Sequence, residues 1–343
     1  MIEIKKIQGL SMPLNHKLIF LFMLLHIISC RDMDKIESKK STIDKVPPIH
    51  TCEEGFNLVD GVCMMESNLD TSMGNTEEAI ESSSDSLECE NWEEIHPNWL
   101  WCDDFEINNL DSNYFDVYHM NGDFSVSKKE AFRGDGSLET IYRPGRVENG
   151  SLKRSFGKNP VKEQSFESEK FQEIYWRFYV KTEKGFQGSP NKLTRATMFT
   201  NSGWGQGMIA HLWEGGRLDP VTLINENNQA NAMGINDWSQ MSWIGAIDPL
   251  PGQGLYSASR IGEWTCVEVH VKLNTPGESD GVHEYWFNDE YQVGAHNKNF
   301  RRSYVDYGIN TIFLESYWNT ESPVVQSRFM DNFVISTERI GCL

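Results

Sequence analysis

The strongest constraint on the fold is a two-residue alternation of apolar and polar side chains that recurs along the chain. In residues 173–181, EIYWRFYVK, Ile174, Trp176 and Phe178 alternate with polar or amphipathic neighbours. Residues 265–273, TCVEVHVKL, repeat this pattern with valines. A strand turns successive side chains to opposite faces, whereas a helix repeats every 3.6 residues. Because no long amphipathic helical pattern occurs, the sequence predicts an all-β protein.

Turn residues divide the alternating pattern into many short strands. Residues 123–143 predict two strands across a turn at 133–136, and residues 281–294 predict a hairpin that turns at Asn288 and Asp289. Further strand-like segments are 207–213, 309–318 and 327–337. Many short strands separated by Gly, Asn, Asp and Pro are typical of a β-sandwich or jelly roll. We expect that domain to cover residues 91–343.

The N-terminus has the pattern of a targeting segment. Lysines precede the apolar run LIFLFMLLHII at 18–28, which is followed by Ser29 and Cys30. The apolar run is too short to span a bilayer as a stable helix. IISC resembles a bacterial lipobox, which implies a signal peptide over 1–29, lipidation of Cys30 and a lipoprotein of the bacterial cell envelope, in the periplasm or on the cell surface. An ordinary secretory signal or an uncleaved anchor is the alternative, and Met12 could be the true start.

The cysteine count agrees with a lipidated thiol in a secreted protein. The chain has 7 cysteines, an odd number. Lipid on Cys30 would leave an even set, as expected in an oxidising compartment. Proximity favours the pairs Cys52–Cys63 and Cys89–Cys102, which leaves Cys266–Cys342. No cysteine or histidine spacing predicts a zinc site.

Three segments are predicted between the signal and the main domain. Residues 30–50 form a polar tether, and residues 51–64 form a small disulfide-closed unit that resembles half of an EGF-like module. Residues 65–90 are acidic, rich in serine and poor in core-forming residues, so they predict a disordered linker. The lipid is then the only predicted contact with a membrane.

The charge of the chain excludes a general nucleic-acid binder. The formal net charge is −19, and such a protein repels phosphate backbones. Residues 31–99 contain 17 acidic and five basic residues, whereas residues 100–343 contain 32 acidic and 23 basic residues. The larger part can therefore still hold a locally basic cleft. We expect it to act as a monomer.

Three segments carry a family resemblance. They are FYVKTEKGFQGSPNK at 178–192, GEWTCVEVHVKLNTPGESDGVHEYWFNDE at 262–290 and RFMDNFVIST at 328–337. They resemble concanavalin A-like jelly-roll polysaccharide lyases of the glucuronan and alginate lyase type. That resemblance implies a jelly-roll β-sandwich with a sugar chain on one exposed sheet face. It also implies a structural calcium near Asp331, with Glu106 or Asp135 nearby.

The chain departs from the lyase motifs in two places. The motifs of one large alginate-lyase group are not present in the sequence. RATMF at 195–199 and MIAHLW at 208–213 resemble them only distantly. The Glu-x-Asp-x-x-Glu strand of laminarinase-type hydrolases is also absent from the sequence. The absence of that strand makes the hydrolase interpretation weaker without removing it.

Several predicted strands contain the residue types that β-elimination on a uronate needs. A cation must neutralise the C6 carboxylate, a base must take the C5 proton, and an acid must protonate O4. The predicted catalytic residues are Arg177, the bases His211 and His270, and the acids Tyr175, Tyr179 and Tyr285. The predicted substrate-binding residues are Lys192, Arg195, Glu268, Lys272 and Trp213. We expect these side chains to share one sheet face.

The predicted function is binding, with cleavage by β-elimination, of an acidic, uronate-containing polysaccharide. One alternative is a carbohydrate-binding or adhesion module without catalysis, because fold does not decide function. The other is a glycoside hydrolase, which needs two carboxylates across the scissile bond. Glu173, Glu268 and Glu284 are the strand carboxylates for that chemistry.

Overall fold

The computed structural model describes residues 56–59, 62–65, 87–213 and 215–343. The chain divides into two compact units, Met1–Glu78 and Ala79–Leu343. In the first unit β1 (Phe56–Val59) pairs antiparallel with β2 (Val62–Met65). The predicted signal peptide, tether, lipidated Cys30 and Cys52–Cys63 bond lie outside the described residues.

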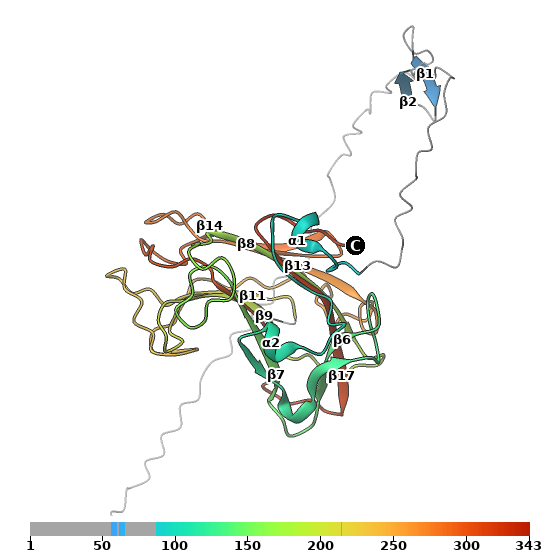
Figure 1. Cartoon of the computed structure of the whole chain (residues 1–343), viewed down its shortest axis with the longest axis horizontal. Helices are drawn as coiled ribbons and strands as arrows, with labels where there is room; N and C mark the ends of the chain where they lie inside the picture. Colours follow the sequence, from blue (N-terminus) through green and yellow to red (C-terminus); the bar gives the residue numbers. More distant parts are fainter. Residues whose placement is uncertain (1–55, 60–61, 66–86, 214) are drawn as a thin grey trace, which may run out of the picture. The chain divides into compact units, whose positions relative to one another are not determined.

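The second unit is a sandwich of two antiparallel sheets, seen edge-on in Figure 1. The eight-stranded sheet has the order β15-β14-β13-β8-β17-β6-β5, with β3 also paired to β17. Its strands are β3 (Trp99–Asp103), β5 (Phe124–Ser127), β6 (Ser137–Tyr142), β8 (Glu173–Thr182), β13 (Thr265–Lys272), β14 (Gly281–Phe287), β15 (Glu290–Lys298) and β17 (Gln326–Ser336). The fold is therefore all-β, as predicted.

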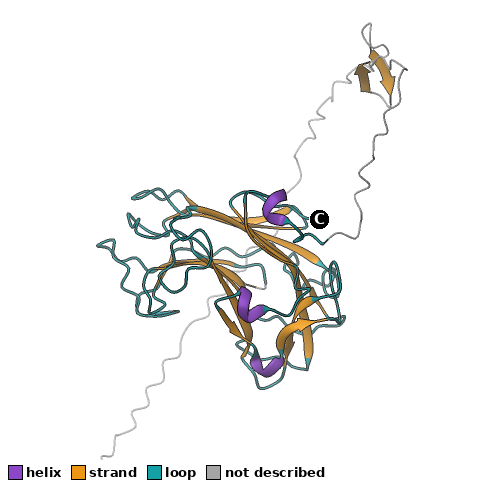
Figure 2. Cartoon of the chain, viewed as in Figure 1, coloured by secondary structure: helices purple, strands orange, loops and turns teal. Residues whose placement is uncertain are grey.

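The seven-stranded sheet has the order β12-β11-β10-β9-β16-β7-β4. Its strands are β4 (Asp116–Tyr118), β7 (Glu148–Ser155), β9 (Lys192–Phe199), β10 (Gln206–Trp213), β11 (Leu218–Thr222), β12 (Ser242–Trp243) and β16 (Thr311–Tyr317). The helical segments of the described chain are α1 (Trp92–Ile95), α2 (Leu110–Asn113) and the 3₁₀ turn η1 (Met120–Gly122); Figure 2 shows how little of the body they occupy. Among the described residues no helix is long and apolar enough to cross a membrane.

The core lies between the two sheets and explains the alternation in the sequence. Trp176 and Phe178 of β8 are buried with Met198 of β9 in one apolar cluster. The indole N–H of Trp176 donates a hydrogen bond of 2.9 Å to the hydroxyl of Thr194 across the sandwich. The residues between these positions point away from the core, so each sheet has a second, outer face.

The predicted hairpin at Asn288 and Asp289 is confirmed. Phe287 pairs with Glu290, and both turn residues have positive φ, 49° and 64°. Two left-handed residues match the twist of a two-residue hairpin, and asparagine and aspartate tolerate that conformation.

Both chain ends of the second unit cover the outer face of the eight-stranded sheet. The Cys89–Cys102 disulfide holds the N-terminal segment, and the Cys266–Cys342 disulfide holds the C-terminal tail to β13. Both disulfides were predicted and are present. Because Glu88 also pairs with the sheet residue Arg177, the folded body begins before residue 91.

Candidate functional site

A groove of about 640 Å³ lies on the outer face of the seven-stranded sheet. Strands β4, β7, β9 and β16 supply its floor, and the segment after β11 supplies part of its wall. Its described lining includes Asp116, Tyr118, Glu148, Ser151, Lys153, Lys192, Arg195, Trp213, Ile235, Asn236, Trp238, Glu315 and Tyr317. This combination of cations, carboxylates, tyrosines and tryptophans suits a polar ligand with apolar ring faces.

The strand register places six functional side chains in one row across this face. From β11 to β4 the directly paired residues are Asp219, His211, Arg195, Phe313, Lys153 and Asp116. Cross-strand partners in antiparallel pairs share a face, so these side chains all point away from the core. In this row Phe313 lies between two cations, Arg195 and Lys153, and the row ends in an aspartate on each side.

Arg195 is buried and held from three sides. Its guanidinium lies 3.0 Å from Glu315 Oε1 and donates a hydrogen bond of 2.7 Å to Asn236 Oδ1. It also lies 4.2 Å from the ring centre of Phe313. Burial lowers the pKa of Arg195, and the charge of Glu315 raises it. The pairing with Glu315 keeps this cation fixed in the groove.

Lys153 approaches Phe313 from the other side. Its ammonium is hydrogen-bonded to Asp116 and lies 5.2 Å from the Phe313 ring centre. It also lies 5.8 Å from the ring centre of Trp204. Two cations therefore flank one aromatic ring, each with its own carboxylate partner, Glu315 for Arg195 and Asp116 for Lys153.

Lys192 is the groove cation without a carboxylate partner. Within the described residues its Nζ makes no hydrogen bond or ion pair, and it lies 4.7 Å from the ring centre of Tyr317, its direct partner across β9 and β16. Burial lowers the pKa of Lys192 below its ordinary value, and Arg195 and Lys153 add to that shift. Glu315 and Glu148 act in the opposite direction.

His211 is paired with Arg195 in this row but does not line the groove. It is buried, and its ring stacks on Trp213 at 5.0 Å. Burial lowers its pKa well below the ordinary value, and the charges of Arg195 and Lys192 lower it further. A neutral imidazole in this place can support Trp213, which lines the groove.

The predicted site residues do not share one face, and that expectation is wrong. Four of them, Lys192, Arg195, His211 and Trp213, lie on the groove side of the seven-stranded sheet. Six others lie on strands of the eight-stranded sheet. They are Arg177, Tyr175, Tyr179, His270, Glu268 and Lys272. Alternation fixes which side of its own strand a residue occupies, but it does not fix which sheet the strand joins.

Several of the six residues on the eight-stranded sheet bind one another or the segments at the two ends of the described domain. Arg177 is fully buried and pairs with Glu88. Glu268 accepts hydrogen bonds from the backbone N–H groups of Ile340 and Gly341, and the hydroxyl of Tyr179 accepts one from Leu343. These contacts supply a structural reason for polar side chains on this face.

His270 is buried and joins a polar network on the same sheet. Its two ring nitrogens lie 2.8 Å from Glu173 and 2.9 Å from Glu284, and its ring stacks on Tyr175 at 4.2 Å. Burial raises the pKa of Tyr175 to about 12, with Glu173 adding to the shift. Lys272 lies 3.7 Å from Glu173. The predicted roles of His270, Tyr175 and Lys272 stay predictions, and none of these residues lines the groove.

Tyr285 lies neither on the groove side of the seven-stranded sheet nor on the outer face of the eight-stranded sheet. It is fully buried in the apolar cluster between the sheets. Burial raises its pKa far above the ordinary value. A tyrosine enclosed in the core cannot reach a polymer on either outer face.

Two of the predicted calcium ligands, Asp331 and Glu106, accept hydrogen bonds from backbone N–H groups. Asp331 accepts hydrogen bonds from the backbone of Phe132 and Asn332, and Glu106 accepts them from Asp135 and Gly136. Burial raises the pKa of Asp331 to about 8. Among the described residues no group of three or more His, Cys, Asp or Glu side chains is placed to hold a metal ion. Calcium binding stays a prediction.

Several groove residues were missed by the sequence analysis. They are Asp116, Lys153, Glu315 and Tyr317. The signal was present in two strands: Phe313, Glu315 and Tyr317 alternate with Ile312 and Leu314, and Lys153 alternates with Leu152. The phase of those two strands predicts outward positions for Lys153, Glu315 and Tyr317, as it does for the polar residues of 173–181.

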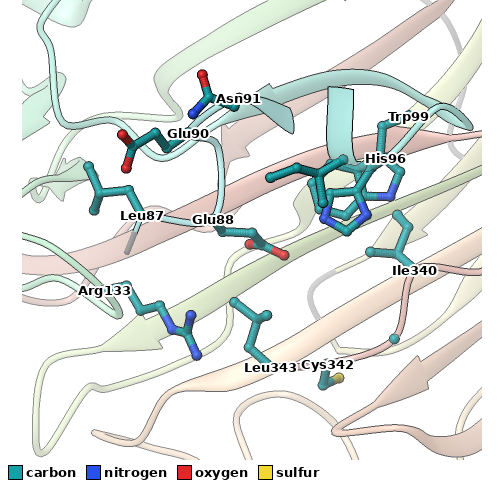
Figure 3. A pocket seen from close by; sticks show the side chains of 12 residues that line it. Leu87, Glu88, Glu90, Asn91, His96, Trp99, Arg133, Ile340, Cys342 and Leu343 are labelled. Carbon is teal, nitrogen blue, oxygen red and sulfur yellow. The ribbon is translucent and has the colours of Figure 1, made fainter. Parts of the chain in front are cut away.

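Another cavity lies where the chain ends meet. It has a volume of about 500 Å³, and Figure 3 shows Glu88, Arg133, Ile340 and Leu343 around it. A third, of about 520 Å³, lies beside Trp101 and Arg154. Neither combines several cations with tyrosines, so the groove is the better site for an acidic ligand.

Comparisons with known proteins give distant likenesses of fold. No family model matches the chain, and no curated protein matches it. An endo-β-1,4-glucuronan lyase from the fungus Trichoderma reesei is 14% identical, with a TM-score of 0.48, over 70% of this chain and 96% of that one. A marine alginate lyase from Aplysia kurodai has the same identity and TM-score over 70% of this chain and 99% of its own.

An alginate lyase from Chlorella virus is a third such likeness. It is 16% identical, with a TM-score of 0.42, over 66% of this chain and the whole of that one. All three likenesses have TM-scores below 0.5 and identities of 14% to 16%. Likenesses this distant assign no activity, so the function is argued from the groove.

Proposed function

We propose that this protein binds an acidic polysaccharide in the groove and cleaves it by β-elimination next to a uronate. The observation that carries the proposal is the position of Lys192. It is a half-buried cation without a carboxylate partner among the described residues, in contact with the ring of Tyr317. A base and an acid side by side are what proton transfer from C5 to O4 requires.

Arg195 and Lys153 are the proposed partners of the substrate carboxylate. Both lie against Phe313, 4.2 and 5.2 Å from its ring centre. A C6 carboxylate over that ring would meet a cation on each side. Fixed cations stabilise the negative charge that develops when the C5 proton leaves. Glu315 and Asp116 hold the two cations in place, so they need no rearrangement.

Lys192 is the proposed base, and Tyr317 is the proposed acid. Neutral Lys192 takes the C5 proton, the C5–H electrons form the C4–C5 double bond, and the C4–O4 bond breaks. The Tyr317 hydroxyl gives its proton to O4. The Lys192 ammonium then returns a proton to the Tyr317 phenolate, which restores both groups. The lowered pKa of Lys192 increases the fraction of neutral amine.

The test is the ultraviolet absorbance of the unsaturated uronate product on a panel of uronate polymers. We expect absorbance to rise with the wild-type chain and to be lost in Lys192→Ala and Lys192→Arg. Arginine keeps the charge but cannot act as a base at ordinary pH. The matched control is Lys158→Ala, since Lys158 lies at the same 4.7 Å from the ring centre of Tyr307 elsewhere on the surface. Retained cleavage in Lys192→Arg would exclude the proposed base.

The other two functions are outcomes of the same experiment. Reducing ends without a double bond would indicate a hydrolase, with Glu315 and Asp116 as the groove carboxylates to mutate first. Binding without either product would indicate a carbohydrate-binding module.

We also propose that the protein is anchored to the bacterial envelope by lipid on Cys30. The support is the lipobox-like IISC and the even number of cysteines left for disulfides.

A further inference from the structure

The charges that line the groove are balanced. Its described lining contains three acidic residues and three basic ones: Asp116, Glu148, Glu315, Lys153, Lys192 and Arg195. Two of the cations already have carboxylate partners, Lys153 with Asp116 and Arg195 with Glu315. These pairs leave one cation, Lys192, and one carboxylate, Glu148, without an ion-pair partner among the described residues.

A dense polyanion would meet little compensation in such a groove. The chain carries a net charge of −19, and residues 100–343 hold more acidic than basic residues. A polymer with a carboxylate on every sugar would bring several charges into the groove at once. Binding of such polymers depends on complementary positive potential, which the balanced lining does not supply.

Exposed apolar side chains extend the groove beyond its charged centre. Trp238 is 72% exposed and lines the groove, and its ring centre lies 6.3 Å from that of Trp243, which is 46% exposed. Ile235 and Tyr118 also line the groove and are 38% and 48% exposed. Amphipathic aromatic rings bind ligands that have one apolar face and a polar rim. The C–H face of a neutral sugar ring has that character.

We propose that the groove selects a heteropolysaccharide in which a single uronate is flanked by neutral sugars. This inference rests on the proposed function and names its substrate class. The uronate lies at the cation-flanked centre, and a neutral sugar stacks on Trp238. A polymer made of uronates alone is the poorer substrate.

The test compares polymers of different uronate density. Gellan has one glucuronate among neutral sugars in each repeat, hyaluronan alternates, and glucuronan and alginate are uronate throughout. Initial rates of absorbance increase and binding by calorimetry are measured separately with the wild-type chain. We expect both to be highest for gellan and to change less than about threefold between about 10 mM and about 300 mM salt. A higher rate and tighter binding on glucuronan or alginate would overturn the inference.

Two variants test the two parts of the inference. Asp116→Asn combined with Glu315→Gln frees two cations, so we expect glucuronan binding to tighten about tenfold and to become steeply salt-dependent. Trp238→Ala should weaken gellan binding about threefold to tenfold. Its control is Tyr291→Ala, an exposed aromatic on β15 of the other sheet. Equal effects of the two aromatic variants would overturn the stacking role.

The readouts separate this inference from the proposed function. Selective binding of gellan without any absorbance change would support the groove's selectivity and overturn the lyase chemistry. Cleavage that favours glucuronan or alginate would support the chemistry and overturn the selectivity. Absence of both binding and cleavage across the panel would overturn both.

Discussion

The carboxylate of Glu88 is hydrogen-bonded to the guanidinium of Arg177, 89 positions later in the chain. Arg177 is fully buried on β8, and only 6% of the Glu88 side chain is exposed. Asn332 of β17 donates a second hydrogen bond, of 2.9 Å, to the same carboxylate. The polar outer face of β8 is therefore a docking surface for the N-terminal segment of the domain.

Glu88→Ala should lower the free energy of unfolding by about 3 kcal/mol or more, because it leaves the Arg177 charge buried without a partner. Urea denaturation measures this loss. The exposed neighbour Glu90 provides the control Glu90→Ala, which should change stability by less than about 0.5 kcal/mol. Polymer cleavage by the folded Glu88→Ala variant should equal that of the wild type, because the pair is not part of the groove. If the Glu88→Ala variant were stable but inactive, Arg177 would again be a candidate catalytic residue.

The disulfide between Cys266 and Cys342 should also be structural. It closes a loop with a sequence separation of 76, which corresponds to about 4 kcal/mol by loop-closure entropy. The double variant Cys266→Ser, Cys342→Ser should lose up to that amount in urea denaturation. Glu268 still binds the backbone of Ile340 and Gly341, so a smaller loss would measure how well the tail is held without the bond.

Side-chain alternation was enough to predict the all-β sandwich, because it reports which side of each strand is apolar. It could not assign strands to sheets. β8 and β9 follow one another in the sequence but belong to different sheets. Arg177 and Arg195, which look equivalent in the sequence, therefore lie on strands of different sheets. Long-range pairing such as β9 with β16 decides this, and single-sequence periodicity contains no information about it.

Only part of the groove could be predicted from the sequence, for the same reason. Lys192, Arg195 and Trp213 were identified, but their partners Glu315 and Tyr317 come from β16, more than a hundred residues later. The cation pairing that leaves Lys192 without a carboxylate partner among the described residues depends on side-chain positions. Composition alone suggested only that a basic cleft was possible in this part of the chain.

His283 should make the fold sensitive to acid. It is fully buried on β14, and neither ring nitrogen has a hydrogen-bond partner among the described residues. Burial lowers its pKa from the ordinary 6.5 to about 3. Because the folded-state pKa is lowered, this contribution to stability is complete above pH 6.5 and is lost as the pH falls towards 3.

His283→Leu should remove that acid sensitivity. We expect unfolding free energy at pH 7 to be equal or higher, since an unpaired buried polar group is replaced. Between pH 7 and pH 4 the variant should lose less stability than the wild type, by as much as about 3 kcal/mol. Urea denaturation at both pH values measures the difference, with the half-exposed His296→Leu as control. Parallel pH curves for wild type and His283→Leu would contradict the assignment.

Lipidation of Cys30 can be tested without any structural assumption. In a bacterial host the full chain should incorporate labelled fatty acid and partition into detergent, and Cys30→Ser should do neither. The control Cys52→Ser should retain the label, because Cys52 is predicted to form a disulfide. Label in Cys30→Ser would contradict the lipobox interpretation.

The role of Lys192 as a base predicts the direction of the pH–rate profile. The base acts as a neutral amine, so the rate should rise with pH as the ammonium loses its proton. Because burial lowers the pKa of Lys192 below its ordinary value of 10.5, this rise should occur below that pH. Lys192→Arg should lose the rise together with at least about a hundredfold in kcat, while gellan binding is largely retained. Tyr317→Phe should lower kcat and keep the position of the alkaline rise, because the tyrosine acts as the acid. If Tyr317→Phe moved or abolished the rise while Lys192→Arg kept it, the two roles would have to be exchanged.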